Sequence, residues 1–156
     1  MCGIAGKVYF GDGKVNLQEL GHMSSKIAHR GPDDEGFYVS PDKRVGLVNR
    51  RLAIIDLSAR GHQPMRRGSL VITFNGEIYN FQELKKKLEK EGDRFTSGTD
   101  TEVILALYQK WGTKCLKFLR GMFAFAIYDE SKKTVFLARD RLGKKPLKYY
   151  FKNGRF

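Results

Sequence analysis

The pattern that most constrains the fold is a pair of apolar segments, residues 123–128 and 134–140, separated by a few mostly polar residues. Both segments carry Phe together with Ile or Val, and residues 129–133 between them have the composition of a turn. Short β-branched and aromatic runs joined in this way are typical of a β-hairpin. Because the strands of a hairpin are antiparallel, we expect antiparallel sheets rather than an alternating parallel β/α arrangement.

The remaining elements follow from apolar periodicity and from turn residues. The expected strands cover residues 2–10, 37–40, 44–55, 69–76 and a final pair within 142–156, and the expected helices cover 17–29, 77–92 and 97–112. Residues 56–68 are expected to form a long loop. The grouping of two helices between hairpin-linked strands predicts an α+β fold in which helices cover antiparallel sheets.

Two helix starts carry capping signals. Asn80 with Glu83, and Thr99 with Glu102, have the spacing at which a polar N-cap and an acidic residue satisfy free N–H groups. The turn pair Asn75-Gly76 is expected to close the strand before the first of these helices.

Length and composition set the scale of the fold. The chain has 156 residues, of which 41% are hydrophobic and 12% aromatic, so we expect one domain with a substantial core. No stretch approaches the roughly 18 uninterrupted apolar residues of a membrane helix. Gly, Lys and Asp occur close to the N-terminus, which is unlike a signal peptide. We therefore expect a soluble, cytoplasmic protein.

The chain contains two cysteines, Cys2 and Cys115. Two thiols cannot form the disulfide framework of a small secreted domain, and no C-x-x-C or histidine-rich spacing indicates a metal site. Cys115 lies in an apolar helical stretch and is most simply a small buried side chain. Cys2 differs because it directly follows Met1.

A net charge of +12 raises the question of nucleic-acid binding. The Lys and Arg residues are dispersed, with Lys144 and Lys145 near the end, and no zinc-finger, RNA-recognition or helix-turn-helix signature accompanies them. Solvated surfaces that face an acidic partner or another domain explain the charge at least as well. Nucleic acid is therefore only a minor candidate partner.

Removal of Met1 would give Cys2 both a thiol and a free α-amine. Unperturbed thiols and N-terminal amines have pKa values of about 8.5 and about 7.7–8.0, so the amine can accept the thiol proton near neutral pH. Such a nucleophile needs no histidine. The alternative interpretation is a buried strand residue that happens to follow Met1.

Further positions carry the groups that a carboxamide hydrolase needs. Asn75-Gly76 offers a side-chain amide and a backbone N–H to a developing oxyanion. Arg51 can form a forked pair with a carboxylate, and Asp100 at a helix start can receive an ammonium. Each also has an ordinary explanation: a β-turn, a surface arginine, and an acid that balances the helix dipole.

Taken together, the motifs resemble those of a known family. They are MCGIAG, HRGPDDEG, RRLAIIDL, GHQP, FNGEIYN, SGTDTEVILALY, GMFAFAIYD and ARDRLGKKPL, from Met1 to about Tyr150. In this order they resemble the N-terminal glutaminase domain of glutamine-hydrolysing asparagine synthetase, a class II glutamine amidotransferase domain. HRGPDDEG and RRLAIIDL favour this branch over the glucosamine-phosphate synthase and glutamate synthase branches.

The resemblance implies the N-terminal-nucleophile hydrolase fold, a four-layer αββα sandwich of two antiparallel sheets, here ending before the family's last strands. It implies one glutamine amidotransferase domain over residues 1–156 and no ATP-dependent synthetase domain. The nucleophile is then Cys2, and the oxyanion hole consists of the Asn75 side chain and the Gly76 N–H.

The resemblance also implies the residues that hold the substrate. Arg51 would bind the carboxylate of glutamine, and Glu77 with Asp100 would bind its α-ammonium. Arg30 and Gly31, in the HRGP loop, would belong to a flap over the pocket. No metal ligand is expected.

The implied reaction is hydrolysis of glutamine to glutamate and ammonia through a thioester on Cys2. No cofactor is expected for this domain, because ATP and magnesium belong to the family's synthetase domain, whose pyrophosphate loop does not occur in this sequence. A synthetase domain or subunit would supply the ammonia acceptor. The alternatives are a non-catalytic or split-subunit amidotransferase-like module, or the glutaminase domain of another ATP-dependent amidotransferase.

Overall fold

The computed structural model describes residues 1–156 and contains two antiparallel sheets. The three-stranded sheet has the order β1-β3-β2 and consists of β1 (Gly3–Val8), β2 (Asp34–Val39) and β3 (Val45–Arg51). The four-stranded sheet has the order β4-β5-β6-β7 and consists of β4 (Met65–Arg67), β5 (Leu70–Ile78), β6 (Gly121–Asp129) and β7 (Thr134–Arg139). The hairpin expected around residues 129–133 is β6–β7, so this prediction is confirmed.

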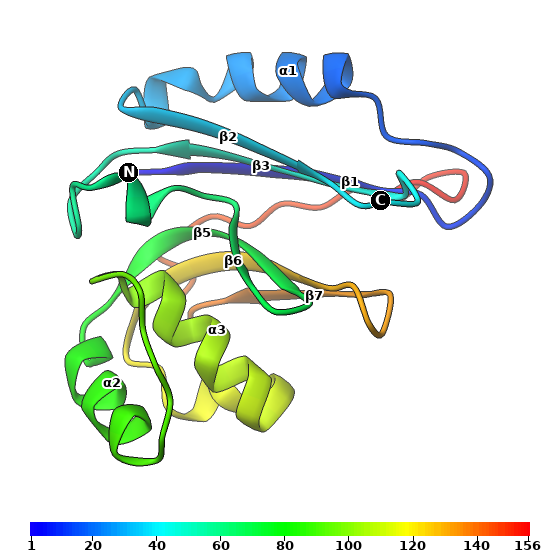
Figure 1. Ribbon diagram of the computed structural model, residues 1–156. Coiled ribbons are helices and arrows are strands. Elements are labelled where there is room, and N and C mark those ends of the chain that lie inside the picture. Colours follow the sequence, from blue (N-terminus) through cyan, green and yellow to red (C-terminus); the bar gives the residue numbers. More distant parts are fainter.

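Helices cover the outer faces of both sheets. They are α1 (Leu17–Lys26), α2 (Phe81–Lys90) and α3 (Asp100–Trp111), with short 3₁₀ turns at Ala28–Arg30, Ala59–Gly61 and Gly112–Lys117. Figure 1 shows α1 outside the three-stranded sheet, the two sheets face to face, and α2 with α3 outside the four-stranded sheet. The four-layer αββα sandwich expected from the sequence is confirmed.

Each interface between layers has its own apolar core. The largest, a cluster of 19 buried residues, lies between the four-stranded sheet and the helices that cover it. Along β5, Ile72 and Phe74 belong to this cluster, whereas Val71 packs in the smaller cluster that also contains Val45 and Leu47 of the opposite sheet. Because successive strand residues point to opposite faces, β5 is buried on both sides and reads as a continuous apolar run.

Several element boundaries differ from the expected ones. The first helix ends at Lys26, and β3 ends at Arg51 instead of continuing to residue 55. The expected loop 56–68 contains the short strand β4. Residues 142–156 form only isolated bridges around the turn at Asn153-Gly154, where both residues have positive φ, so the expected strand pair is not formed.

The two capping predictions have different outcomes. Thr99 caps α3, because its side chain accepts a hydrogen bond from the Glu102 N–H. Asn80 precedes α2 without a side-chain cap; its amide instead bonds Phe118 O and Arg120 N, next to the start of β6. The capping prediction for Asn80 was therefore wrong, because a tertiary contact uses the same amide.

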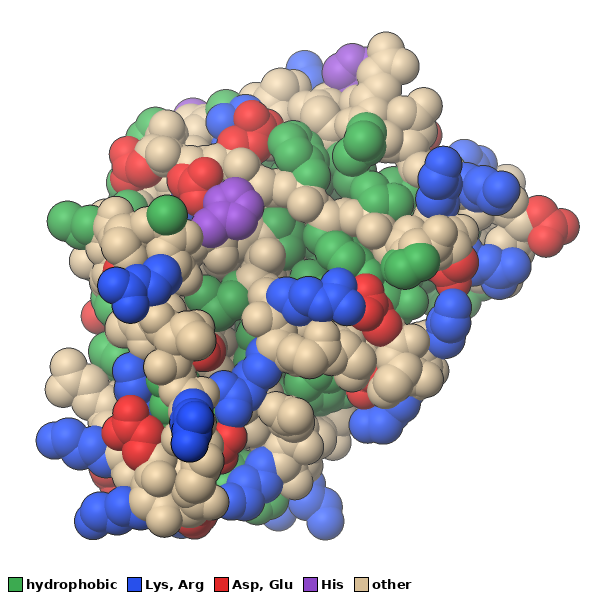
Figure 2. Space-filling view, viewed as in Figure 1, with side chains coloured by type: hydrophobic (Ala, Val, Ile, Leu, Met, Phe, Trp, Pro, Cys, Tyr) green, Lys and Arg blue, Asp and Glu red, His purple; other side chains and the backbone are tan.

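The surface carries the excess positive charge in a dispersed form. Figure 2 shows Lys and Arg side chains at many separate places on the visible face, interspersed with acidic and uncharged side chains. No helix has the length and apolar character required to cross a membrane.

Candidate active site

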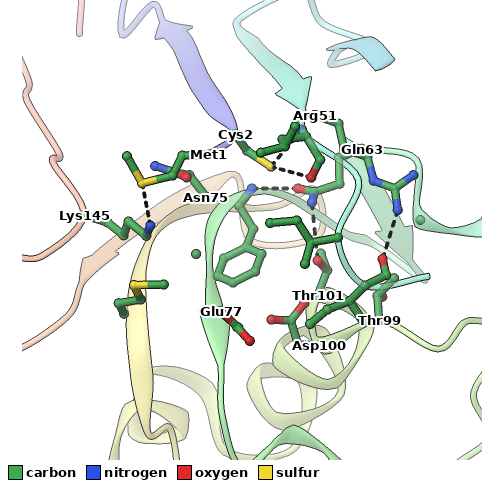
Figure 3. A pocket seen from close by; sticks show the side chains of 17 residues that line it. Met1, Cys2, Arg51, Gln63, Asn75, Glu77, Thr99, Asp100, Thr101 and Lys145 are labelled. Atoms are coloured by element: carbon green, nitrogen blue, oxygen red, sulfur yellow. Dashed lines mark hydrogen bonds between the residues drawn. The ribbon is translucent and has the colours of Figure 1, made fainter. Parts of the chain in front are cut away.

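One pocket collects the catalytic and substrate-binding residues that the sequence suggested. Its wall includes Cys2, Arg51, Asn75, Gly76, Glu77 and Asp100. They come from the residue before β1, the end of β3, the second half of β5 and the first turn of α3, which meet at one end of the sandwich (Figures 1 and 3). Their proximity therefore depends on the packing of distant segments rather than on sequence spacing.

Cys2 is held in the pocket through both its backbone and its sulfur. β1 pairs with β3 so that Gly3 lies opposite Arg50, which brings Cys2 beside Leu52. The Leu52 N–H donates to Cys2 Sγ with a nitrogen–sulfur distance of 3.4 Å, and the thiol lies 3.7 Å from Leu52 O. These two contacts fix the position of the sulfur at the end of β3. The Cys2 side chain is only partly buried, so a substrate can approach the sulfur.

Arg30 and Gly31 lie behind Cys2 and do not line the pocket. Arg30 Nε donates to Cys2 O at 3.1 Å and thereby fixes the backbone of Cys2. A Cβ at Gly31 would lie 2.2 Å from Arg50 O, so only glycine fits between these segments. Their assignment to a flap remains a prediction.

Asn75 and Gly76 are strand residues and not the turn that their sequence favours. They lie within β5 opposite Ala124 and Phe123 of β6, and the strand continues to Ile78. A Cβ at Gly76 would lie 2.3 Å from Met122 O, which explains the glycine by close strand approach. The turn interpretation is therefore wrong.

The side chain of Asn75 has unused hydrogen-bonding capacity. It is buried, yet its Oδ1 makes no hydrogen bond within the protein. Most buried polar atoms have a hydrogen-bond partner, and an amide oxygen without one can accept a hydrogen bond from a bound molecule. The pocket thus has an amide at its wall that is available to a bound molecule.

Arg51 brings a positive charge into the pocket without a carboxylate partner. The guanidinium is buried and donates to the backbone carbonyls of Ile55, Asp56 and Ser58, but it makes no ion pair. Gly61 leaves room for it, since a Cβ there would lie 1.9 Å from Arg51 Nη2. A buried cation held only by carbonyl dipoles is suited to pair with an incoming anion.

Asp100 and Glu77 supply the opposite charge. Asp100 is the first residue of α3, and its Oδ2 accepts a hydrogen bond from the Ile78 N–H at 2.9 Å, which ties the helix to β5. Burial raises the pKa of Asp100 to about 6, and the nearby Glu77 charge adds to this increase. A cation placed between the two carboxylates would relieve their repulsion.

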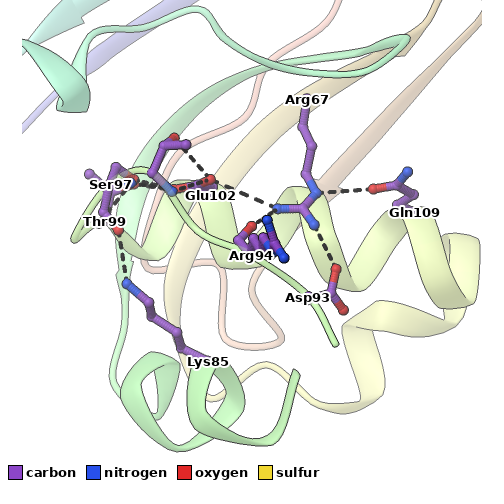
Figure 4. Close-up of polar contacts among 9 residues, drawn as sticks. Arg67, Lys85, Asp93, Arg94, Ser97, Thr99, Glu102 and Gln109 are labelled. Carbon is purple, nitrogen blue, oxygen red and sulfur yellow. Dashed lines mark hydrogen bonds and ion pairs between the residues drawn. The ribbon is translucent and has the colours of Figure 1, made fainter. Parts of the chain in front are cut away.

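The N-terminus of α3 is fixed by a second buried acid, Glu102 (Figure 4). Its carboxylate accepts hydrogen bonds from the N–H groups of Thr96 and Ser97, and Arg67 lies 3.8 Å away. Burial opposes ionisation of Glu102, but the hydrogen bonds from Ser97 and Thr96 lower its pKa on balance. These contacts hold the segment before Thr99 and so orient Asp100 toward the pocket.

Asp100→Asn should stabilise the fold at neutral pH. The pKa of Asp100 is about 6 in the folded state, which is above the value for an acid in the unfolded chain. The ionised carboxylate therefore destabilises the native state by its full amount above pH 6. This cost decreases as the pH falls from 6 to the unfolded-state pKa. We expect the free energy of unfolding to rise on the order of 2–3 kcal/mol at pH 7.5, with the gain disappearing near pH 4. Urea unfolding at several pH values measures this difference.

Asp129→Asn is the matched control. Burial disfavours the Asp129 carboxylate, but hydrogen bonds from Ser131 and Lys132 lower its pKa overall. This substitution should therefore reduce stability at neutral pH. A loss of stability in Asp100→Asn that is equal at pH 7.5 and pH 4 would contradict the assignment of a burial cost to Asp100.

Gln63 and Lys145 are two pocket-wall residues to which the sequence assigned no role in the site. Gln63 is buried and links the segments around the pocket: its Oε1 accepts from the Phe74 N–H at 2.8 Å, and its Nε2 donates to Thr101 Oγ1 at 3.3 Å. The GHQP motif marks this position, but nothing in its composition indicates the contacts. Lys145 is the second; the sequence suggested a solvated charge, whereas the side chain is only 3% exposed.

Comparison with known protein families identifies the family to which the chain belongs. A family model described as a glutamine amidotransferase domain matches residues 1–156. The chain belongs to the glutamine amidotransferase domain family. Membership extends over the whole pocket described above, since every residue of its wall lies within the matched range.

Known relatives are longer amidotransferases. A Methanocaldococcus jannaschii protein, provisionally named glutamine-hydrolysing asparagine synthetase 2, is 45% identical over 100% of this chain and 33% of its own length. Glutamine-hydrolysing asparagine synthetase 3 of Bacillus subtilis is 40% identical over 99% of this chain and 25% of its own length. The glutamine amidotransferase domain described here thus spans a quarter to a third of these relatives and is homologous to their glutamine-hydrolysing part.

A solved structure shares the fold. Glutamine phosphoribosylpyrophosphate amidotransferase from B. subtilis, complexed with ADP and GMP, matches with a TM-score of 0.68 and 20% identity over 88% of this chain and 37% of that chain. The N-terminal-nucleophile hydrolase fold expected from the motifs is confirmed.

Proposed function

We propose that this glutamine amidotransferase domain hydrolyses glutamine to glutamate and ammonia, with Cys2 as the nucleophile. The supporting observation is the pocket as a whole. A partly exposed thiol shares it with a buried arginine that lacks an acidic partner, a pair of carboxylates and an amide with free hydrogen-bonding capacity. Each of these groups complements one part of a glutamine molecule.

Substrate binding uses the charges at the end of the pocket away from the thiol. Arg51 binds the α-carboxylate of glutamine, and Asp100 with Glu77 binds the α-ammonium. Both ends of the zwitterion then neutralise groups that are costly to keep buried and unpaired. This arrangement leaves the side-chain carboxamide to reach Cys2.

The reaction proceeds through a covalent intermediate. The N-terminal amine takes the Cys2 proton, the sulfur attacks the carboxamide carbon, and the oxyanion accepts hydrogen bonds from the Asn75 side-chain NH2 and the Gly76 N–H. The amine then gives a proton to the departing nitrogen, and ammonia leaves. Water, deprotonated by the same amine, hydrolyses the γ-glutamyl thioester and releases glutamate with the free thiol.

This mechanism requires that Met1 be removed. While Met1 is attached, the nitrogen of Cys2 is an amide and cannot serve as a base. Met1 also lies in the wall of the pocket, so its removal enlarges the space beside the thiol. The active species is the processed chain.

The affinity for glutamine should depend on the ionisation of Asp100. Protonation of this carboxyl below its pKa of about 6 removes a negative charge that faces the substrate ammonium. We expect KM for glutamine to rise as the pH falls below about 6, and Asp100→Asn to raise KM at all pH values and to flatten this dependence. KM is measured for the wild type and for Asp100→Asn between pH 5 and pH 8. Parallel plots of KM against pH for the two proteins would contradict the assignment.

The direct test is catalysis by the processed chain. Glutamate and ammonia release from L-glutamine are measured, with D-glutamine as the matched control because its ammonium cannot reach the carboxylates in the same pose. We expect equimolar glutamate and ammonia from L-glutamine alone. Absence of turnover in a folded protein that is confirmed to begin at Cys2 would contradict the proposal.

We further propose that the ammonia serves a synthetase domain or subunit that makes asparagine. The names and greater length of the relatives support this acceptor. ATP and magnesium would be used by that part, and glutamine hydrolysis itself needs no cofactor. A cytoplasmic location fits such a biosynthetic role. Co-purification and asparagine formation with a candidate synthetase partner would test the proposal; ammonia transfer to a different ATP-activated acid would contradict it.

A further inference from the structure

Lys145 is a buried ammonium in the wall of the active-site pocket. Its side chain is 3% exposed and lies beside Met1 (Figure 3). The segment that carries it is held in place, because Asp140 accepts hydrogen bonds from the N–H groups of Lys144 and Lys145 at 2.9 and 3.0 Å. Lys145 is therefore a fixed charge rather than a mobile surface residue.

The ammonium lacks a strong acceptor. Its Nζ lies 2.8 Å from Met1 Sδ and makes no ion pair. A thioether is a weak acceptor, and a buried cation normally has a carboxylate or several oxygen partners. Stability alone does not explain a lysine at this position, since an apolar side chain would fill the same volume without burying a charge.

Processing of the chain changes what Lys145 faces. Removal of Met1 takes away the sulfur and converts the nitrogen of Cys2 from a neutral amide into an amine that can be protonated. In Figure 3, Met1 and Lys145 lie on one side of Cys2, and Arg51 lies on the other. Cys2 and Lys145 line the same pocket, so the ammonium and the new N-terminus then share it.

We propose that Lys145 is a positioning residue for the nucleophile: its charge keeps the N-terminal amine of Cys2 neutral and favours the Cys2 thiolate. The proposal rests on the proposed function of Cys2. A second positive charge on the amine is disfavoured beside the Lys145 ammonium, and the negative thiolate is favoured. The first effect keeps the amine unprotonated, and therefore able to act as a base, near neutral pH, and the second lowers the energy of the attacking thiolate.

The other charged groups around the pocket do not replace Lys145. Arg30 contacts the carbonyl of Cys2, and Arg51 is held by loop carbonyls beyond it. Glu77 and Asp100 have the opposite sign and would stabilise a protonated amine, but bound glutamine neutralises them. Lys145 is thus the cation that contacts the residue removed on processing, whereas Arg30 reaches Cys2 only at its carbonyl oxygen.

The test compares Lys145→Met with Lys145→Arg in the processed chain. Methionine keeps the length and apolar stem without the charge, and arginine keeps the charge. The measurements are glutamate release and the rate of alkylation of Cys2 by iodoacetamide, both as functions of pH, with the adduct located by peptide mapping. Lys145→Gln is a second neutral variant in case Lys145→Met does not fold.

We expect the rising limb of both profiles to move to higher pH in the neutral variant. A shift of the profile by one pH unit gives about tenfold lower rates near pH 7 and little change near pH 9. We expect Lys145→Arg to recover the wild-type profile. Profiles that coincide with the wild type, or a loss that is equal at every pH, would overturn the proposal. The two proposals fail separately: absence of glutamine turnover in the wild type counts against the function, whereas the alkylation profile of Cys2 still tests Lys145.

Discussion

Replacing Cys2 with alanine should lower glutamate release by a factor of about 10⁴ or more while the protein stays folded, because the substitution removes the only group that forms the covalent intermediate. We expect a small loss of stability, since the thiol is only partly buried and its hydrogen bonds are to the backbone of Leu52. Steady-state turnover gives the rate, and thermal unfolding monitors the fold.

Cys115→Ala is the matched control for this loss. Cys115 is fully buried, and burial raises the pKa of its thiol to about 11, so it can neither meet glutamine nor form a thiolate near neutral pH. We expect full activity and a loss of stability of about 1 kcal/mol from the small cavity. Wild-type turnover in Cys2→Ala would contradict the assignment of the nucleophile.

Asn75→Ala should reduce kcat for glutamine by about 10²–10³ with little change in KM. The amide is proposed to bind the oxyanion, which exists only in the tetrahedral intermediate and the transition states that flank it. Since the Asn75 Oδ1 makes no hydrogen bond within the protein, its removal breaks no contact of the fold at that atom. Separate determination of kcat and KM in folded protein measures the effect.

Asn80→Ala provides a matched asparagine outside the pocket. Its amide bonds Phe118 O and Arg120 N, so this substitution should lower stability and leave kcat unchanged. An increase in KM alone for Asn75→Ala would indicate that the amide binds the ground state, and an unchanged kcat would remove it from the oxyanion site.

The elements that the sequence predicted well are those with a local signal. The β6–β7 hairpin and the apolar face of α2, which buries Leu84 and Leu88, could be read from composition and spacing. The Asn75-Gly76 pair could not, because its strong turn preference is overridden by continuous pairing of β5 with β6 from Leu70 to Ile78. A local turn preference is thus overridden where the surrounding residues pair continuously with a neighbouring strand.

The candidate site shows the same division. Cys2 stood out by its position in the chain, and Arg51, Asn75 and Asp100 carried suitable chemistry, but only a family resemblance connected them before the fold brought them together. Lys145 had no distinguishing signal, because a lysine in a basic segment normally indicates solvent exposure. Its burial depends on the turn that Asp140 fixes, through contacts between residues that no periodicity encodes.

The central claim is that glutamine is attacked by the sulfur of an N-terminal Cys2, and trapping the intermediate tests it most directly. The processed chain is mixed with glutamine, quenched in acid during turnover and digested, and peptide mass spectrometry locates the γ-glutamyl group. We predict an acid-stable thioester on Cys2 in a peptide that lacks Met1 and has a free amine. Turnover without a γ-glutamyl group on Cys2, or with the group on Cys115, would contradict the account.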